Sequence, residues 1–550
     1  MTQDLKHTAS QGERQDSSQG TPWLKFLIFF TGAATLSLEL LASRIMTPYF
    51  GVSLYIWTGI LSITLIFLAI GYYLGGRLTV GREPASILAL YLLAPFLAAL
   101  VLVGAGLTYP LIFPLLAWGN LIIASFVGGT MLLAIPLILL SAMNPLLIAL
   151  GRGDGPEGDS GAGRVFFLST IGSVAGVIVT AFLLIPTMTN FRAVMGISLA
   201  LCVATALTAW RLHGLPRLVR RKFLFLCCLL AILSLVVQWG QPRFVRLLAE
   251  NSGIDQHWEM LAEYTSVFGN IKVVAVYRGE HRRLTDLMYL QDGIVQNHFN
   301  QHGQAVDHTP MMLRLAEIYA PPEAQQAGVL GLAAGAIPKR LQADGLQVTV
   351  AEINPRALDA AKDFFGYDPQ GIKHHWEDAR TLVRRRPQAF DLVLVDLFQG
   401  DATPEYLLTR EFFQDLKNSL KPGGIVIMNM FFDNLDEQPN ERLLATITSV
   451  FPQILEFRRP SQSGTFLNAF VVGRFGPLAP EPAFQAAATI TPEDDDARRT
   501  LNSARLVHRE NLTHLEPVTD DHNIFPYLLA RSHLRTRSVL SKLPLYLLIN

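Results

Sequence analysis

A turn with two glycines, followed by an acidic residue about 20 positions later, is the first pattern in this chain that predicts a chemistry. Gly331 and Gly335 lie in VLGLAAGAIP after an apolar stretch, and Glu352 ends the next apolar stretch, VTVAE. Glycines let the backbone turn tightly against a ligand, and a carboxylate at the second strand end can accept both hydrogen bonds of a ribose diol. The pattern predicts a nucleoside site. The alternative is that both glycines serve helix packing and Glu352 is a solvated strand end.

Two further acids follow at strand or helix boundaries. Asp378, in HHWEDARTLV, precedes a predicted helix that begins at Ala379, so it either caps that helix or faces a ligand. Asp396 ends the strongly apolar stretch FDLVLVD, where an acid that enters a crevice favours a functional role. Because the carboxyl ends of parallel strands meet at one sheet edge, we expect Gly331, Glu352, Asp378 and Asp396 to converge on one crevice.

The elements that must position these residues form an α/β domain. Strands at 328–332, 348–353, 391–398 and 425–430 alternate with helical stretches, which predicts a parallel sheet covered on both faces. Upstream, alternating residues between 260 and 300 with a turn at Asp292-Gly293 predict a small antiparallel β unit. The fold class is therefore an α-helical multi-pass membrane domain plus a Rossmann-like domain of the class I methyltransferase type, with a small β-rich unit at its N-terminal side.

The first half predicts the membrane domain. Stretches near or above the roughly 20 apolar residues that cross a bilayer occur at 24–44, 54–76, 86–106, 120–142, 165–187, 190–210 and 222–239. We count about seven spans. Pro110, Pro114, Pro136 and Pro145 interrupt the region 86–150 and leave a broken or re-entrant helix, hence six or eight spans, as alternatives.

The resulting domain boundaries are as follows. We expect a disordered tail at 1–22, the membrane domain at 23–240, the β unit at 241–300, the Rossmann-like domain at 301–480 and a C-terminal extension at 481–550. The polar tail has no apolar core followed by a small-residue cleavage site, so it does not resemble a signal peptide.

Charge within and around the spans raises two questions. Glu39 lies inside the first span, where an unpaired carboxylate is costly, so it must face protein or water. Arg44 lies near the span end, and the alternatives are a structural ion pair or a snorkelled charge, or a role in transport or binding. Arginines in the loop 211–222 and after the second span place both loops, and the N-terminus, in the cytoplasm. A crossing at 222–239 then puts the second half outside. Three alternatives stay open: that segment does not cross, the charge rule fails, or the second half is extracytoplasmic.

Composition excludes several classes of function. Forty-five basic and 45 acidic residues give no overall field that favours a nucleic-acid partner. The three cysteines, Cys202, Cys227 and Cys228, lie in apolar segments without metal-ligand spacing, which indicates buried thiols, no disulfide framework and no metal site.

Together, several motifs carry a family resemblance. The order QDGIVQ, GLAAG, AEIN, EDAR, FDLVLVDLF and YLLTREFFQDLKNSLKPGGIVIMN resembles the spermidine synthase family of aminopropyltransferases, over about 240–475. In the first half, LELLASRIMTPYFG, IGYYLGGRL and STIGSVAGVIVTAFLLIP resemble the membrane-embedded, spermidine synthase-fused proteins of bacteria. The resemblance implies the bacterial inner (plasma) membrane as location, with the side of the soluble domain left open, and a homodimer.

The resemblance also implies a reaction and a role for each matching residue. Family enzymes transfer an aminopropyl group from decarboxylated S-adenosylmethionine to a diamine such as putrescine, without metal or prosthetic group. Glu352 would bind the ribose hydroxyls after the Gly331 to Gly335 turn, Asp378 with the Ala379 backbone would read adenine, and Gln296 would lie near the propylamine. Asp396 would accept the acceptor amine's proton, because an amine is nucleophilic only when deprotonated.

The chain also departs from the family pattern. Ala334 replaces an aspartate that grips the donor's amine. The acceptor pocket is remodelled at Asp307, His308, Thr309, Gln399 (with Asp401 nearby), Ser461 and Gln462. We interpret His308 as a neutral spacer, the alternative being a contact with a different acceptor. Two other functions stay open: a polyamine or solute transporter or sensor whose nucleoside domain is regulatory or inactive, favoured by Glu39 and Arg44, and an S-adenosylmethionine-dependent methyltransferase, favoured by Ala334.

Overall fold

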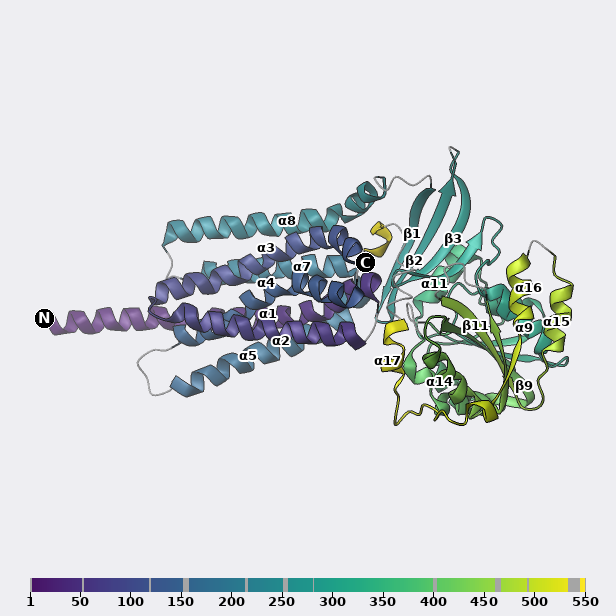
Figure 1. Ribbon diagram of the computed structural model, residues 1–550. Helices are drawn as coiled ribbons and strands as arrows, with labels where there is room; N and C mark the ends of the chain where they lie inside the picture. The colour runs from purple at the N-terminus through teal and green to yellow at the C-terminus, as the bar shows by residue number, and fades with distance from the viewer. Residues whose placement is uncertain are drawn as a thin grey trace. The chain divides into compact units, whose positions relative to one another are not determined.

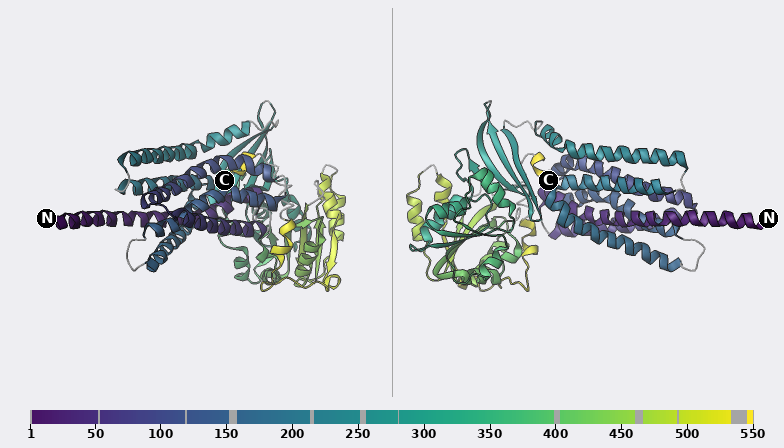
Figure 2. Two further views of the ribbon diagram at one scale, coloured as in Figure 1. Left: turned by 60° about the vertical axis from the view of Figure 1, so that its left-hand side comes forward. Right: turned by 180° about the vertical axis from the view of Figure 1, so that it is seen from behind.

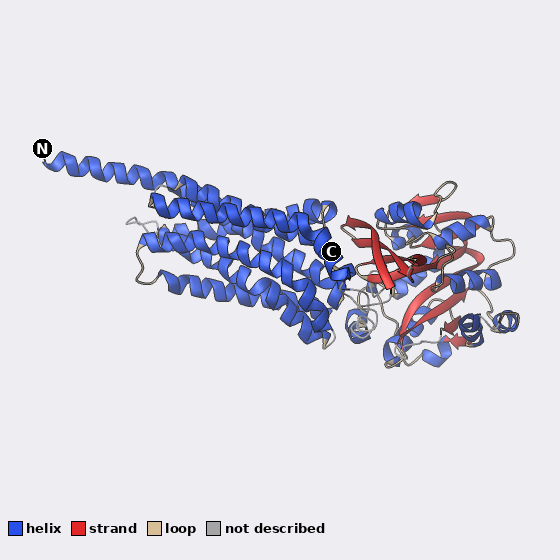
Figure 3. Cartoon of the chain, turned by 90° about the horizontal axis from the view of Figure 1, so that it is seen from above, coloured by secondary structure: helices blue, strands red, loops and turns tan. Residues whose placement is uncertain are grey.

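The chain divides into two compact units in this computed structural model (Figure 1). Unit 1 comprises Met1–Phe50, Tyr55–Ser252 and Leu548–Asn550, and unit 2 comprises Gly51–Leu54 and Gly253–Leu547. The structure describes residues 2–51, 54–117, 120–151, 158–212, 216–250, 256–279, 281–398, 403–459, 466–491, 494–532 and 545–549. Helices make up the N-terminal unit, and all the strands lie in the C-terminal unit (Figure 3).

Unit 1 is a bundle of long helices that lie side by side in each view (Figure 2). Its elements are α1 (Thr2–Phe50), α2 (Leu54–Thr79), α3 (Pro84–Ala117), α4 (Leu121–Leu150), α5 (Gly158–Val179), the π-helical turn η1 (Thr180–Leu184), α6 (Ile185–Thr187), α7 (Asn190–Arg211) and α8 (Arg217–Glu250). Seven of the described helices are long and apolar enough to cross a membrane, by length and composition. Each of the seven predicted spans overlaps one of them over most of its length.

The prolines of the third and fourth spans do not break the helices. Pro110 and Pro114 lie inside α3, and Pro136 and Pro145 lie inside α4, so this region forms two continuous helices and not a re-entrant segment. Packed helices tolerate such prolines because neighbouring groups and local adjustments satisfy the freed carbonyls.

Two other features of the bundle differ from the sequence-based expectations. Helix α1 begins at Thr2, in the range where the sequence predicts a disordered tail. Cys202 and Cys227 are buried as expected, but Cys228 is exposed. Glu39 and Arg44 are both half-buried on α1.

Close packing of α1 against α5 depends on glycines. A Cβ atom at Gly172 or Gly176 of α5 would collide with the backbone of Phe29 or Ala33 of α1. Ser173 Oγ donates a 2.9 Å hydrogen bond to the carbonyl oxygen of Gly32. Small residues at such contacts let two backbones approach closely, which is how helices associate without a hydrophobic driving force.

This contact generates a prediction for Gly176→Ala. The added methyl group must push α5 away from α1, so we expect a destabilisation of about 1–3 kcal/mol. Thermal melting of the protein in detergent micelles measures it. Gly163→Ala, also in α5 but with open space around the new methyl group, is the matched control and should leave the melting temperature unchanged or raise it slightly. Equal melting temperatures for both variants would contradict the assigned contact.

Unit 2 begins with a four-stranded antiparallel sheet. Its order is β1-β2-β3-β4, formed by β1 (Gln256–Ser266), β2 (Gly269–Arg278), β3 (Arg283–Gln291) and β4 (Ile294–Asn300). The turn between β3 and β4 holds Asp292 and Gly293, both at positive φ (48° and 78°), as a two-residue hairpin of the primed type requires. The predicted β unit and its turn are present.

The main sheet has eight strands in the order β12-β10-β11-β9-β8-β5-β6-β7. They are β5 (Gln326–Leu330), β6 (Gln347–Ala351), β7 (Lys373–His375), β8 (Phe390–Val395), β9 (Leu420–Asp433), β10 (Gln453–Arg458), β11 (Phe466–Arg474) and β12 (Arg505–His508). Strands β7, β6, β5, β8 and β9 pair in parallel, and β11, β10 and β12 add antiparallel pairs. The chain leaves β5 towards β6 and later returns to its other side as β8. The switch point of this Rossmann-like sheet therefore lies between β5 and β8.

Helices cover the main sheet with two separate apolar cores. One core contains buried residues of α9 (Thr309–Tyr319), α10 (Ala336–Ala343) and α11 (Arg356–Phe365) together with residues of the small sheet. The other contains residues of α12 (Ala379–Arg384), α13 (Arg410–Ser419) and α14 (Glu437–Thr448), joined by Val518 and Phe525 of the C-terminal extension. Both cores hold the carboxyl ends of β5, β6 and β8 in fixed positions.

Candidate functional site

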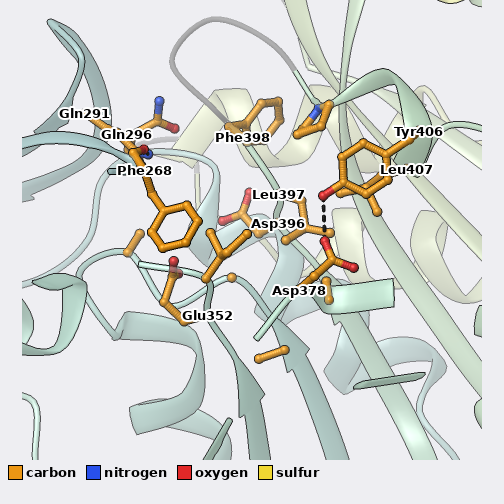
Figure 4. A pocket seen from close by; sticks show the side chains of 16 residues that line it. Phe268, Gln291, Gln296, Glu352, Asp378, Asp396, Leu397, Phe398, Tyr406 and Leu407 are labelled. Atoms are coloured by element: carbon orange, nitrogen blue, oxygen red, sulfur yellow. Dashed lines mark hydrogen bonds between the residues drawn. The ribbon is translucent and has the colours of Figure 1, made fainter. Parts of the chain in front are cut away.

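A pocket lies at the switch point of the main sheet. Of the predicted site residues, Gln296, Gly331, Glu352, Asp378, Ala379 and Asp396 line it, and Gly335 does not. In Figure 4 the side chains of Glu352, Asp396 and Asp378 surround one space. The sequence analysis missed the remaining lining residues, which are mostly apolar or aromatic: Phe268, Gln291, Ala333, Ala351, Ile353, Leu397, Phe398, Pro404, Tyr406 and Leu407.

The turn after β5 needs glycine at two positions, and a different neighbour excludes a side chain at each. Gly331 has a φ of 100°, and a Cβ atom there would collide with the carbonyl oxygen of Asp396. Only glycine lets β5 end so close to the end of β8. Gly335, at a φ of 77°, precedes α10, and a Cβ there would meet the ring of Tyr367. The positive φ and the close Tyr367 ring both require glycine at this position, whether or not a ligand also lies near it.

Glu352 is half-buried directly after β6 and held by the backbone. Its Oε2 accepts a hydrogen bond from Leu332 N (2.9 Å), and its Oε1 accepts one from Asn354 N (2.8 Å). Burial raises the pKa of Glu352, although backbone N–H groups oppose the shift. The Glu352 side chain also lines the pocket, so its carboxylate is held by the backbone beside the space for a ligand.

Asp378 caps a helix and also lies at the pocket. It is the N-cap of α12, where its Oδ1 accepts a hydrogen bond from Thr381 N (3.2 Å), and it also lines the pocket. Its Oδ2 accepts a 2.5 Å hydrogen bond from the Tyr406 hydroxyl group, drawn as a dashed line in Figure 4. Burial and the bond to Asp378 raise the pKa of the Tyr406 phenol, which therefore stays protonated as the donor.

Asp396 is paired with His308, which corrects the interpretation of His308 as a neutral spacer. His308 Nε2 lies 2.8 Å from Asp396 Oδ2, and each side chain is only 11% exposed. Burial lowers the pKa of His308, but the charges of Asp396 and Asp307 outweigh it and raise the pKa to about 9. Burial likewise raises the pKa of Asp396, and His308 with Asn429 reverses the shift to a lowered value. Near neutral pH the two groups form an imidazolium–carboxylate pair.

A second hydrogen bond fixes the other oxygen of Asp396. Asn429 Nδ2, on β9, donates to Asp396 Oδ1 over 2.9 Å, and Asn429 Oδ1 accepts from Asn468 Nδ2 of β11 over 3.0 Å. The sequence gave no signal for either asparagine, because both lie inside apolar strands far along the chain. The carboxylate of Asp396 is thereby fixed from two directions.

The positions that depart from the family pattern have local partners. The backbone N–H of Ala334 donates to Asn297 Oδ1 (3.0 Å), and Asn297 Nδ2 donates to Asp307 Oδ2 (2.9 Å). Asp307 Oδ1 also accepts from Thr309 N (2.7 Å). Asp307 thus stabilises the loop before α9. Gln399, Asp401, Ser461 and Gln462 lie outside the described residues.

Comparisons with known proteins agree with this geometry. Residues 342–458, which include Glu352, Asp378 and Asp396, match the family model described as the spermine/spermidine synthase domain. The α/β unit is spermidine synthase-like. The chain is similar to a polyamine aminopropyltransferase of Vibrio vulnificus, 28% identical over 182 residues, which are 32% of this chain and 59% of the relative. It therefore spans less than two thirds of that relative.

Other relatives cover shorter segments. Polyamine aminopropyltransferase 2 of Pseudomonas aeruginosa is 33% identical over 85 residues, 15% of this chain and 24% of the relative. The N-terminal histidine N-methyltransferase of Emericella nidulans is 32% identical over 135 residues, 24% of each chain. Among solved structures, a probable spermidine synthase from Corynebacterium glutamicum has a TM-score of 0.37 at 18% identity, covering 46% of this chain and 93% of that one.

The ion pair between His308 and Asp396 predicts a pH-dependent stability. Because the folded pKa of His308 is raised from 6.5 to about 9, its contribution is fully present below pH 6.5 and is lost as the pH rises through 9. His308→Gln should therefore destabilise the protein by about 2 kcal/mol near pH 6 and by little near pH 10.

Thermal melting of both proteins at pH 6 and pH 10 measures this difference. His281→Gln, which changes an exposed histidine, controls for the general loss of an imidazole and should melt like the wild type at both pH values. A His308→Gln effect of the same size at pH 6 and pH 10 would contradict the charged pair.

Proposed function

We propose that unit 2 transfers an aminopropyl group from decarboxylated S-adenosylmethionine to a diamine such as putrescine. The observation that carries the proposal is the single pocket lined by Glu352, Asp378 and Asp396, all within the family-matched segment. The polyamine aminopropyltransferases among the relatives support the same reaction.

The nucleoside end of the pocket is formed by Glu352 and Asp378. The carboxylate of Glu352, which the backbone holds at the pocket, would accept hydrogen bonds from the ribose diol. Asp378, at the N-terminus of α12 and beside the Ala379 backbone, would bind the amino edge of adenine, with Tyr406 and Leu407 as neighbouring surfaces. No prosthetic group or metal ion is needed for this reaction.

The reacting end of the pocket contains Asp396 beside Leu397 and Phe398. As the amine attacks the carbon next to the sulfonium, a C–N bond forms, the C–S bond breaks, and positive charge develops on nitrogen. The lowered pKa of Asp396 keeps its carboxylate charged. This charge orients the amine and stabilises the positive charge that develops on nitrogen, and the proton of the product nitrogen passes to the carboxylate or to solvent water.

A second candidate is methyl transfer from S-adenosylmethionine itself. Ala334 is buried and offers no carboxylate to a donor ammonium group. This position therefore does not favour decarboxylated S-adenosylmethionine over S-adenosylmethionine itself. The histidine N-methyltransferase relative is consistent with this alternative. Calorimetry with each of the two donors distinguishes the candidates.

The proposed roles predict opposite effects for two variants. Asp396→Asn should lower kcat about a hundredfold, because a fixed charge at the reacting nitrogen is lost, and should leave the Kd of decarboxylated S-adenosylmethionine nearly unchanged. Glu352→Gln should raise that Kd about tenfold or more, because a charged acceptor for the ribose is lost. Calorimetry measures Kd, and mass spectrometry of the product measures kcat.

The exposed Glu441→Gln is the matched control and should behave like the wild type in both measurements. Full product formation by Asp396→Asn would remove its assigned role. A wild-type protein that binds neither S-adenosylmethionine nor its decarboxylated form would refute both transferase proposals.

We further propose that unit 1 spans a bacterial inner membrane seven times, supported by the length and composition of its helices. A cytosolic nucleoside donor requires unit 2 on the cytoplasmic side, whereas the arginines of the loop 211–222 indicate the opposite. Because the donor is cytosolic, we expect unit 2 on the cytoplasmic side. Green fluorescent protein fused after Asn550 should then fluoresce, and alkaline phosphatase fused there should be inactive. The reverse result would place the unit outside, away from that donor.

A further inference from the structure

Residues 518–523 of the C-terminal extension lie beside residues 405–411, which include the pocket residues Tyr406 and Leu407. Arg410 N donates to Val518 O over 2.8 Å, and Asn523 Nδ2 donates to Glu405 O over 3.0 Å. Between these two contacts, Asp520 N donates to Glu411 Oε2 over 2.9 Å. Residues 518–523 are thus bonded at several points to residues 405–411, although more than 100 residues separate them in sequence.

At the centre of this contact, Asp520 binds the guanidinium group of Arg380. Arg380 Nη1 and Nη2 donate to the two oxygens of Asp520 over 2.9 and 2.6 Å, a bidentate pair. Arg380 is buried, and its Nε donates to Asp415 Oδ2 of α13 over 2.8 Å. A bidentate pair of this kind fixes the orientation of the guanidinium group as well as its distance from the carboxylate. Arg380 belongs to the first turn of α12, directly after the pocket residues Asp378 and Ala379.

The same carboxylate also holds the segment that carries Tyr406. Asp520 Oδ1 accepts a 2.7 Å hydrogen bond from Thr409 Oγ1, and Thr409 is fully buried. Arg380 Nη1 lies 3.4 Å from the carbonyl oxygen of Tyr406. Tyr406 in turn lines the pocket and donates to Asp378. A chain of contacts therefore leads from Asp520 to both sides of the nucleoside end.

We propose that Asp520 is a positioning residue for the nucleoside pocket: by holding Arg380 and Thr409, it fixes the Tyr406 segment against the start of α12. Asp520 touches no pocket atom itself and acts through these two residues. The proposal rests on the proposed function only for the identity of the ligand, an adenine nucleoside sulfonium. It assigns the C-terminal extension a role in ligand affinity, which makes the extension part of the site.

Asp520→Asn tests this role, because it keeps the size of the side chain and removes its charge. Amide hydrogen exchange of the full-length protein in nanodiscs, without ligand, reports on peptides that cover 403–409, and calorimetry with decarboxylated S-adenosylmethionine gives Kd. We expect faster exchange in these peptides and a Kd raised about tenfold, the effect of one charged hydrogen bond. Asp520→Glu should restore most of the affinity.

The neighbouring exposed residue Asp521 provides the matched control, and Asp521→Asn should leave exchange and Kd at wild-type values. If Asp520→Asn exchanges at 403–409 like Asp521→Asn, the positioning role is wrong, whatever the Kd. If the wild type binds no nucleoside but Asp520→Asn still raises exchange at 403–409, the proposed function fails while the positioning of the segment stands.

Discussion

The close approach of β5 and β8 at their carboxyl ends is the constraint on which the site depends. Asp396 N donates to Leu330 O, and Gly331 N donates to Ala351 O, both over 2.9 Å, so the three strands are joined at the level of the pocket. The missing side chain of Gly331 lets the turn pass directly beside the Asp396 carbonyl group. Glu352, one residue after β6, and Asp396, one residue after β8, consequently enter the same space.

Each of the three pocket carboxylates is stabilised by a different kind of partner. Backbone N–H groups hold Glu352, a helix N-terminus and a phenol hold Asp378, and an imidazolium with an amide holds Asp396. A buried charge without such partners costs several kcal/mol or neutralises through a shift of its pKa. In the proposed reaction, Glu352 and Asp378 would face the neutral nucleoside, and Asp396 would face the cationic centre.

Local patterns in the sequence were sufficient to predict the helices and strands and the residues that follow the strand ends. Continuous apolar stretches identified the seven long helices and β5, β6, β8 and β9, because burial on all sides leaves a signal within each stretch. The position after a buried strand identified Glu352 and Asp396 for the same reason. Roles for these residues came from a family resemblance, and the structure adds partners for them.

The partners themselves had no local signal. His308 and Asp396 are 88 residues apart, Tyr406 and Asp378 are 28 apart, and Arg380 and Asp520 are 140 apart. Their contacts depend on how α9, α12 and the extension pack on the two sheet faces, which periodicity does not encode. The same limit applies to Tyr367, whose ring lies against Gly335 without any signal in the local sequence.

Asn297 has a mechanical consequence for the small sheet. It sits on β4, between Gln296 and the rest of the strand, and bonds both the turn at Ala334 and the loop at Asp307. The hairpin that carries Gln291 and Gln296 is therefore tied to the main sheet beside the site. It cannot swing outward as a flap unless these bonds break. In the proposed function, Gln291 and Gln296 would therefore stay in fixed positions and limit the length of the group that extends from the nucleoside.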